Sequence, residues 1–206
     1  MKNKIKLFSP KSNNLEIKRV VKTLKSGFWS SGAGVGNVLQ FEKNFKKYSN
    51  AKECVAVDSG TAALHLALNV LDINKKEVLV PSLTFASTVN AIKYNGGISV
   101  FVDVNLETLS INLIDLEKKI TKKSKIILPV HFGGYSCDMK SIKKIAKKYS
   151  LFIVEDAAHA CGAKYEGKRI GSLGDFTCFS FHPVKNLAMP KGGAITINTK
   201  NSKQFK

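Results

Sequence analysis

The sequence predicts an α/β protein with a mainly parallel sheet and helices on both faces. From Cys54 onward, short apolar runs alternate with longer segments whose apolar residues recur at helical spacing. Apolar strands separated by helices of this length are typical of parallel sheets that are covered on both sides. With 206 residues and 44% hydrophobic content, the chain can also bury a sizeable core.

Two helices are predicted before this alternation. Residues 15–24 place four apolar side chains on one helical face, Ile17, Val20, Val21 and Leu24. Ser26-Gly27 ends this helix, and a loop rich in Gly and Ser follows over residues 28–37. The loop glycines follow no strand and do not match a dinucleotide-binding fingerprint. A second helix is predicted over residues 39–48.

The alternating part is predicted as strand 54–57, helix 61–71, strand 77–81, helix 84–95, strand 98–104, helix 112–120, strand 125–130, helix 138–149, strand 151–155, and strands 176–181 and 193–198. The domain organisation expected from this order is an N-terminal unit of helices and loop, residues 1–50, packed on a large domain, residues 51–206.

The net charge of +18 invites a nucleic-acid hypothesis, which the arginine content argues against. Only Arg19 and Arg169 are arginines, and the lysines are spread over every predicted helix face. Direct base recognition favours arginine forks, so we expect no nucleic-acid partner. A basic surface would suit an anionic nucleotide substrate instead.

Cysteine spacing indicates a reducing compartment. Cys54, Cys137, Cys161 and Cys178 show no paired spacing, and His159 with Cys161 lacks a second pair of metal ligands, so we expect no metal. Residues 1–14 lack the apolar core of a signal peptide, and no run is long enough to span a bilayer. We therefore expect a cytoplasmic protein without a membrane partner.

Lys185 is the first candidate site residue. An apolar run, residues 176–181, stops at His182-Pro183, and Gly192-Gly193 leads into the next run, which places Lys185 on the loop between them. Hydrophobic residues flank the lysine, so its amine is expected to be partly buried. Desolvation lowers an amine's pKa toward the range in which it is a nucleophile.

Asp156 and the Ser59-Gly60-Thr61 turn complete a set of three groups. Asp156 follows a predicted buried strand at the edge where open α/β sheets bind ligands, although a helix N-cap or a surface turn is an alternative. The turn would place free N–H groups and a hydroxyl at a helix N-terminus, which suits an anion. An anion pocket, a carboxylate and a lysine are what pyridoxal 5'-phosphate requires: a phosphate site, a partner for the pyridine nitrogen and a Schiff-base amine.

The chain also resembles a known family in motifs that follow one order between Leu7 and about Asn198. The resemblance lies in Ser26-Gly27 and in residues 59–67, 81–85, 129–131, 155–160, 171–175 and 180–186. These motifs are similar to those of the DegT/StrS-type nucleotide-sugar aminotransferases, a branch of the fold-type-I pyridoxal phosphate enzymes.

This resemblance implies an aspartate-aminotransferase-like large domain without the family's smaller C-terminal domain, so the chain looks like a fragment or a truncated product. It implies transfer of an amino group from an amino acid, glutamate or glutamine, to a nucleotide-linked keto-sugar for polysaccharide or glycoconjugate biosynthesis. It also implies a homodimer in the full-length form. The alternative is a non-catalytic remnant or a regulatory cofactor-binding module of the same fold.

The resemblance implies roles for individual residues. Lys185 matches the Schiff-base lysine, which also moves the proton between substrate and cofactor, and Asp156 matches the carboxylate at the pyridine nitrogen. Three residues match the phosphate pocket, namely Gly60, Thr61 and Ser180.

Further matches leave alternatives open. Phe85 matches an aromatic that stacks on the cofactor, although the sequence alone favours a core residue of the helix it opens. His159 stands where many relatives carry Gln beside the cofactor's ring hydroxyl. His182 and Trp29 are candidates for substrate contact, although a structural histidine and a flexible connector are equally compatible. His131 ends a predicted strand, where a capping role is favoured.

One departure from the family concerns the loop after Lys185. Residues 188–191 replace a Gly-Glu pair that most relatives carry before Gly192-Gly193. Related sugar dehydratases carry His in place of the lysine, so Lys185 favours transamination over dehydration.

Overall fold

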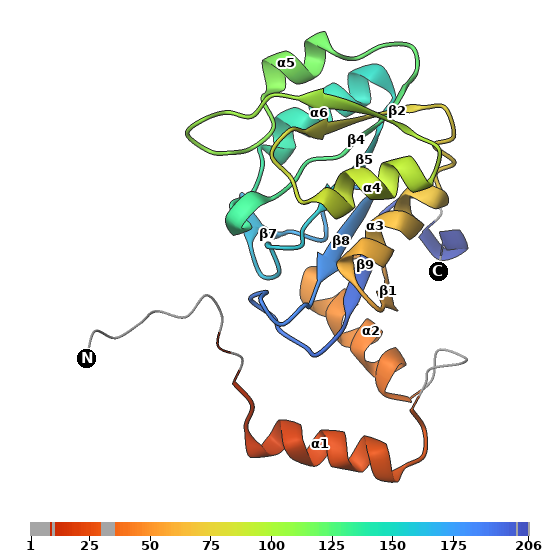
Figure 1. The fold of residues 1–206 in the computed structure, drawn as a ribbon, viewed down its shortest axis with the longest axis vertical. Coiled ribbons are helices and arrows are strands. Elements are labelled where there is room, and N and C mark those ends of the chain that lie inside the picture. Colours follow the sequence, from red (N-terminus) through yellow and green to blue (C-terminus); the bar gives the residue numbers. More distant parts are fainter. Residues whose placement is uncertain (1–8, 10, 30–35, 201, 206) are drawn as a thin grey trace, which may run out of the picture.

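The structure, a computed structural model, describes residues 9, 11–29, 36–200 and 202–205. Its main sheet has seven strands in the order β1-β9-β8-β5-β4-β2-β3 (Figure 1). The strands are β1 (Glu53–Val57), β2 (Glu77–Pro81), β3 (Ile98–Val102), β4 (Ser124–Ile127), β5 (Phe152–Asp156), β8 (Phe176–Ser180) and β9 (Gly193–Ile197). Among the seven strands described, β9 runs antiparallel to the other six, which are parallel to one another, so the prediction of a mainly parallel sheet is confirmed.

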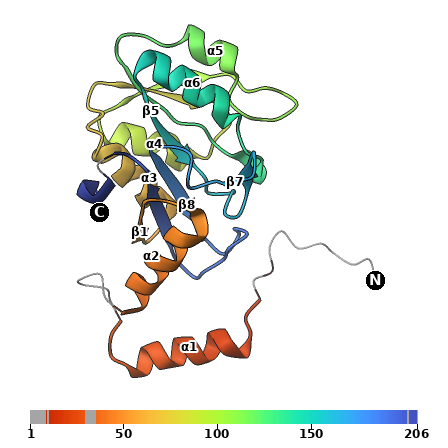
Figure 2. The same cartoon turned by 180° about the vertical axis from the view of Figure 1, so that it is seen from behind.

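Helices cover both faces of the sheet, as predicted (Figures 1 and 2). Along β2, Val78 and Val80 pack into one apolar core with α3 (Gly60–Asn69) and α4 (Ala86–Tyr94). Leu79, between them, packs into a second core on the opposite face. The helices on that face are α2 (Gly36–Ser49), α5 (Leu113–Lys118) and α6 (Met139–Tyr149). Because side chains alternate along a strand, one apolar run supplies both cores.

Several strands end earlier than predicted, because the hydrogen bonds between strands stop before the apolar run in the sequence does. The predicted strand 125–130 pairs fully only over Ser124–Ile127, and Val130 then forms an isolated bridge to Asp156. The sequence also missed a small hairpin, β6 (Lys164–Tyr165) and β7 (Lys168–Arg169). Glu166 and Gly167 form its turn, both with positive φ, which is the conformation that two-residue hairpins favour.

Helix α1 (Asn14–Lys25) lies apart from the sheet (Figure 1). Asn13 and Glu16 form a capping box at the start of this helix. The side chain of Asn13 accepts the main-chain N–H of Glu16, and the side chain of Glu16 accepts the main-chain N–H of Asn13. None of the residues in α1 is buried, so its predicted apolar face is exposed to solvent. The predicted domain boundary near residue 50 stays a prediction.

Five strand ends meet at one edge of the sheet and position the candidate site. β2, β5 and β8 end there because they are parallel, and β1 ends there because both β1 and β8 run antiparallel to β9. β9 begins at the same edge. The loops that leave these strands carry Ser59, Thr84 and Lys185 to the place where Asp156 ends β5.

Candidate functional site

A pocket of about 590 Å³ opens at this edge of the sheet. Its lining includes every candidate site residue except Trp29, namely Gly60, Thr61, Phe85, Asp156, His159, Ser180, His182 and Lys185. The indole of Trp29 is 74% exposed, and its Nε1 donates to the carbonyl oxygen of Leu24 over 3.0 Å. Residues 30–35 of the same loop lie outside the described residues, so the substrate contact of Trp29 stays a prediction.

The candidate anion site, called the anion cradle below, lies where α3 begins against the end of β8. Ser59 caps the helix, since its Oγ accepts the N–H of Ala62 over 3.1 Å. The N–H groups of Gly60 and Thr61 have no partner within the helix, because the first turn has no preceding carbonyls. A Cβ on Gly60 would lie 2.7 Å from Cβ of Ser180, so glycine allows the close approach of helix and strand. Gly60, Thr61 and Ser180 all line the pocket, so the start of α3 and the end of β8 can offer free N–H groups and two hydroxyls to an anion there.

Asp156 ends β5 and is 5% exposed. Its Oδ1 accepts the N–H of Ala158 over 3.1 Å, and its Oδ2 accepts the hydroxyl of Thr88 over 2.8 Å. The alternative of a helix N-cap or a surface turn was therefore wrong, because the carboxylate is buried and no helix begins there. Thr88 was not among the candidates, since its contact with Asp156 spans 68 residues.

Lys185 lies half-buried on the pocket wall, in the loop between β8 and β9. Its N–H donates to the carbonyl oxygen of His182 over 2.8 Å, and the side-chain amide of Asn186 donates to the carbonyl oxygen of Cys161. Burial lowers the pKa of Lys185 below its ordinary value, and the negative charge of Asp156 opposes this shift only in part. The amine is therefore partly buried, as the hydrophobic residues that flank Lys185 in the sequence led us to expect.

His159 presents a neutral ring to the pocket. Its Nδ1 accepts the main-chain N–H of Gly133 over 3.3 Å, so the ring proton lies on Nε2. Burial and the nearby charge of Lys185 both lower the pKa of His159, which keeps the ring neutral at pH 7. The side chain is consequently a hydrogen-bond donor at Nε2, as the amide of a Gln would be.

Phe85 is exposed at the mouth of the pocket. It occupies the N-cap position of α4, and its side chain is 76% exposed. The alternative of a core residue was therefore wrong. Because the helix begins only after Phe85, its side chain lies outside the face that α4 buries, and an aromatic ring remains free to contact a ligand.

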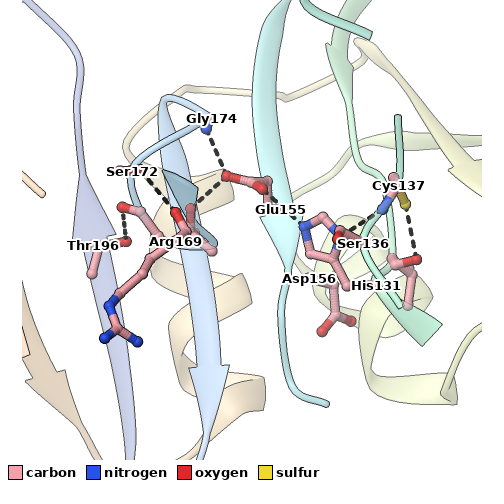
Figure 3. A network of polar contacts seen from close by, with 12 residues as sticks. His131, Ser136, Cys137, Glu155, Asp156, Arg169, Ser172, Gly174 and Thr196 are labelled. Carbon is pink, nitrogen blue, oxygen red and sulfur yellow. Dashed lines mark hydrogen bonds and ion pairs between the residues drawn. The ribbon is translucent and has the colours of Figure 1, made fainter. Parts of the chain in front are cut away.

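His131 occupies the N-cap position of the short 3-10 helix η1 (Phe132–Gly134), but the expected capping role of its side chain was wrong. Its ring is fully buried, and its side chain makes no capping hydrogen bond. Instead it points toward Glu155 and Cys137 (Figure 3). Nδ1 accepts the N–H of Cys137 over 3.1 Å, and Nε2 faces the carboxylate of Glu155. His182, in contrast, is exposed at the pocket, with its carbonyl oxygen fixing the Lys185 turn.

Asp58 and Lys191 form an ion pair on the pocket rim that the sequence analysis missed. Their side chains lie 3.0 Å apart, and both are exposed. Hydrogen bonds from Lys191 and Ser59 hold the pKa of Asp58 below its ordinary value. Lys191 belongs to the segment 188–191 that departs from the family pattern, so this departure does reach the pocket.

Metal ligands and membrane-spanning helices were both searched for in the described part of the chain. Within residues 9, 11–29, 36–200 and 202–205, no cluster of three or more His, Cys, Asp or Glu side chains is placed to hold a metal ion. Over the same ranges, no helix has the length and apolar character needed to cross a membrane.

Comparisons with known proteins agree with this geometry. The spore coat polysaccharide biosynthesis protein SpsC of Bacillus subtilis is 47% identical over 89% of this chain and 46% of its own length. GDP-perosamine synthase of Escherichia coli O157:H7 is 41% identical over 95% of this chain and 54% of its own. The solved structure of Spr1654 from Streptococcus pneumoniae in its PMP form superposes with a TM-score of 0.92 at 32% identity, over 98% of this chain and 54% of that one.

The chain therefore spans about half the length of the relatives it matches. A family model matches residues 10–205, almost the whole sequence. This match, with the fold and the site geometry, confirms the predicted family: the chain belongs to the DegT/DnrJ/EryC1/StrS aminotransferase family.

Proposed function

We propose that the protein is a pyridoxal phosphate-dependent aminotransferase that moves an amino group from glutamate or glutamine to a nucleotide-linked keto-sugar, for polysaccharide or glycoconjugate biosynthesis. The observation that carries this proposal is the convergence of Lys185, Asp156 and the α3 anion cradle on one pocket. A homodimeric assembly belongs to the same proposal.

The residues present fit the cofactor at each of its polar ends. The cradle of Gly60, Thr61 and Ser180 would hold the phosphate. Its close approach of α3 to β8 requires glycine at position 60, because a Cβ there would collide with Ser180. Asp156, buried and held as a hydrogen-bond acceptor, would hold the pyridine nitrogen. Pyridoxal phosphate, when bound, supplies an electron-withdrawing ring that stabilises negative charge on a substrate carbon.

The other residues would orient the substrate and move protons. Lys185 would take up and return a proton at its Nζ, and burial favours release because it lowers the pKa of this amine below its ordinary value. Nε2 of His159 would donate to an oxygen substituent on the cofactor ring, and Phe85 would cover one face of that ring.

Two sets of relatives support this proposal. GDP-perosamine synthase of Escherichia coli, together with dTDP-3-amino-3,6-dideoxy-alpha-D-galactopyranose transaminase of Aneurinibacillus thermoaerophilus, connects similar sequences with nucleotide-linked amino sugars. Spr1654 was solved in both a PLP and a PMP form, which agrees with the predicted cofactor.

Amino transfer itself is the test. The protein is incubated with pyridoxal phosphate, ¹⁵N-labelled glutamate or glutamine and a panel of nucleotide-linked keto-sugars, and the sugar product is analysed by mass spectrometry. We expect labelled amino sugar from the wild-type protein and none from Lys185→Ala, whereas the exposed-lysine control Lys168→Ala should retain transfer. A deoxygenated sugar without label would instead indicate dehydration, and cofactor binding without any product would indicate a binding module.

A further inference from the structure

Thr88 places a buried hydroxyl directly behind the candidate cofactor carboxylate. It lies on α4, is 0% exposed, and its Oγ1 is 2.8 Å from Oδ2 of Asp156. Asp156 lines the pocket, but Thr88 does not. Thr88 therefore influences a bound ligand only through side chains that line the pocket, and Asp156 is the charged one among those it contacts.

The direction of the hydrogen bonds follows from a second threonine. Oγ1 of Thr84, which lines the pocket, lies 2.8 Å from Oγ1 of Thr88. An ionised carboxylate only accepts, so the single proton of the Thr88 hydroxyl points to Asp156 and the proton of Thr84 points to Thr88. Aligned hydrogen bonds polarise one another, so this chain strengthens the donor that Asp156 receives.

The other oxygen of Asp156 has its own fixed donor. Oδ1 accepts the main-chain N–H of Ala158 over 3.1 Å, so one oxygen is held by the turn that follows β5 and the other by α4. This arrangement fixes the plane of the carboxylate. Each carboxylate oxygen has a further lone pair, which remains for a partner in the pocket.

Packing alone does not explain a threonine at this position. A hydroxyl that is buried without a partner costs free energy, and a valine of nearly the same shape would fill the same space. A helical threonine usually bonds a carbonyl in the preceding turn of its own helix. The hydroxyl of Thr88 instead bonds a side chain 68 residues away, on β5.

We propose that Thr88 is a positioning residue that holds the carboxylate of Asp156 in the orientation required by the cofactor's pyridine nitrogen, with Thr84 as the donor behind it. This inference rests on the proposed function. Loss of the Thr88 hydroxyl should weaken cofactor binding roughly tenfold, because a hydrogen bond to a charged group is lost at the site. It should also shift the pH at which the visible absorption of the bound cofactor changes.

The experiment compares Thr88→Val, which lacks the hydroxyl, with Thr88→Ser, which keeps it. The matched control is Thr177→Val, because the hydroxyl of Thr177 is equally buried and donates to Glu155, a carboxylate outside the pocket lining, over 2.7 Å. Each variant is titrated with pyridoxal phosphate, and the bound cofactor's absorption is followed against pH. We expect weaker binding and a shifted pH transition for Thr88→Val, and wild-type values for Thr88→Ser and Thr177→Val. Wild-type values for Thr88→Val, or equal changes in Thr177→Val, would overturn the proposal.

A double-mutant cycle without cofactor tests the contact itself. Thermal unfolding is measured for Thr88→Val, Asp156→Ala and the combined variant. If the hydroxyl holds Asp156, the combined variant should lose less thermal stability than the two single losses added together. Additive losses would overturn the proposal. A wild-type chain that binds no pyridoxal phosphate would contradict the proposed function, and this cycle would then decide alone whether Thr88 holds Asp156.

Discussion

Nε2 of His131 lies 2.8 Å from Oε2 of Glu155, and both side chains are fully buried beside the strand that ends at Asp156 (Figure 3). The other carboxylate oxygen of Glu155 accepts the N–H of Gly174 and the hydroxyl of Thr177. Burial alone would raise the pKa of Glu155, but the hydrogen bonds from His131, Thr177 and Gly174 lower it below its ordinary value. The charged carboxylate on β5 thus forms hydrogen bonds to His131 and to the segment that carries Gly174 and Thr177, and it connects these three parts of the chain behind the site.

Removing this carboxylate should destabilise the fold. Glu155→Ala leaves buried donors without an acceptor, and we expect the free energy of unfolding to fall by about 3–5 kcal/mol. Urea unfolding followed by circular dichroism measures this loss. The exposed Glu107→Ala is the control and should change stability by less than about 0.5 kcal/mol. An equally small loss for Glu155→Ala would show that the network does not stabilise the sheet.

The same carboxylate predicts a pH dependence. Because the pKa of Glu155 is lower in the folded than in the unfolded chain, its stabilisation is complete above the unfolded value of about 4.5. It is lost as the pH falls through the folded value. When the pH is lowered from about 5 to about 3, the Glu155→Gln variant should therefore lose less free energy of unfolding than the wild-type protein does. Parallel stability curves for the two proteins would contradict the lowered pKa.

Phosphate binding at the anion cradle should depend on the absence of a side chain at Gly60. In Gly60→Ala the new Cβ would meet Ser180 Cβ at 2.7 Å, so α3 must move away from β8. We expect a loss of about 1–3 kcal/mol in stability and at least about tenfold weaker binding of pyridoxal phosphate, measured by denaturation and fluorescence titration. Gly167→Ala, in the β6–β7 turn with open space around it, should lose stability through its positive φ but keep cofactor affinity. Equal affinities in both variants would show that the cradle does not bind the phosphate.

The exposed face of α1 predicts self-association of the 206-residue chain. Val20 is 59% and Leu24 57% exposed, and both lie on the apolar face of the helix. Exposed apolar stripes of this kind drive association. Sedimentation should show concentration-dependent association that decreases in the double variant Val20→Gln/Leu24→Gln and persists in Lys18→Gln. Unchanged association in the double variant would assign it to another surface.

Local sequence signals predicted the sheet, the helices that cover it, and two residues that the structure places on one pocket, Lys185 and Asp156. Lys185 and Asp156 could be found because each follows an apolar strand at the edge where such strands end. Phe85 and His131 were placed wrongly by local signals alone, since burial depends on the elements packed around them. Thr88 and Glu155 were missed because their contacts join segments 68 and 24 residues apart, and no local periodicity reports such pairs.

Chemical trapping at Lys185 tests the central claim most directly. The protein is saturated with pyridoxal phosphate, reduced with borohydride, digested, and mapped by mass spectrometry. The account predicts a pyridoxyl label on Lys185 alone among the chain's lysines, loss of the visible absorption on reduction, and no label in Lys185→Ala. A label on a different lysine, or an unlabelled Lys185 in a protein that has bound the cofactor, would contradict it.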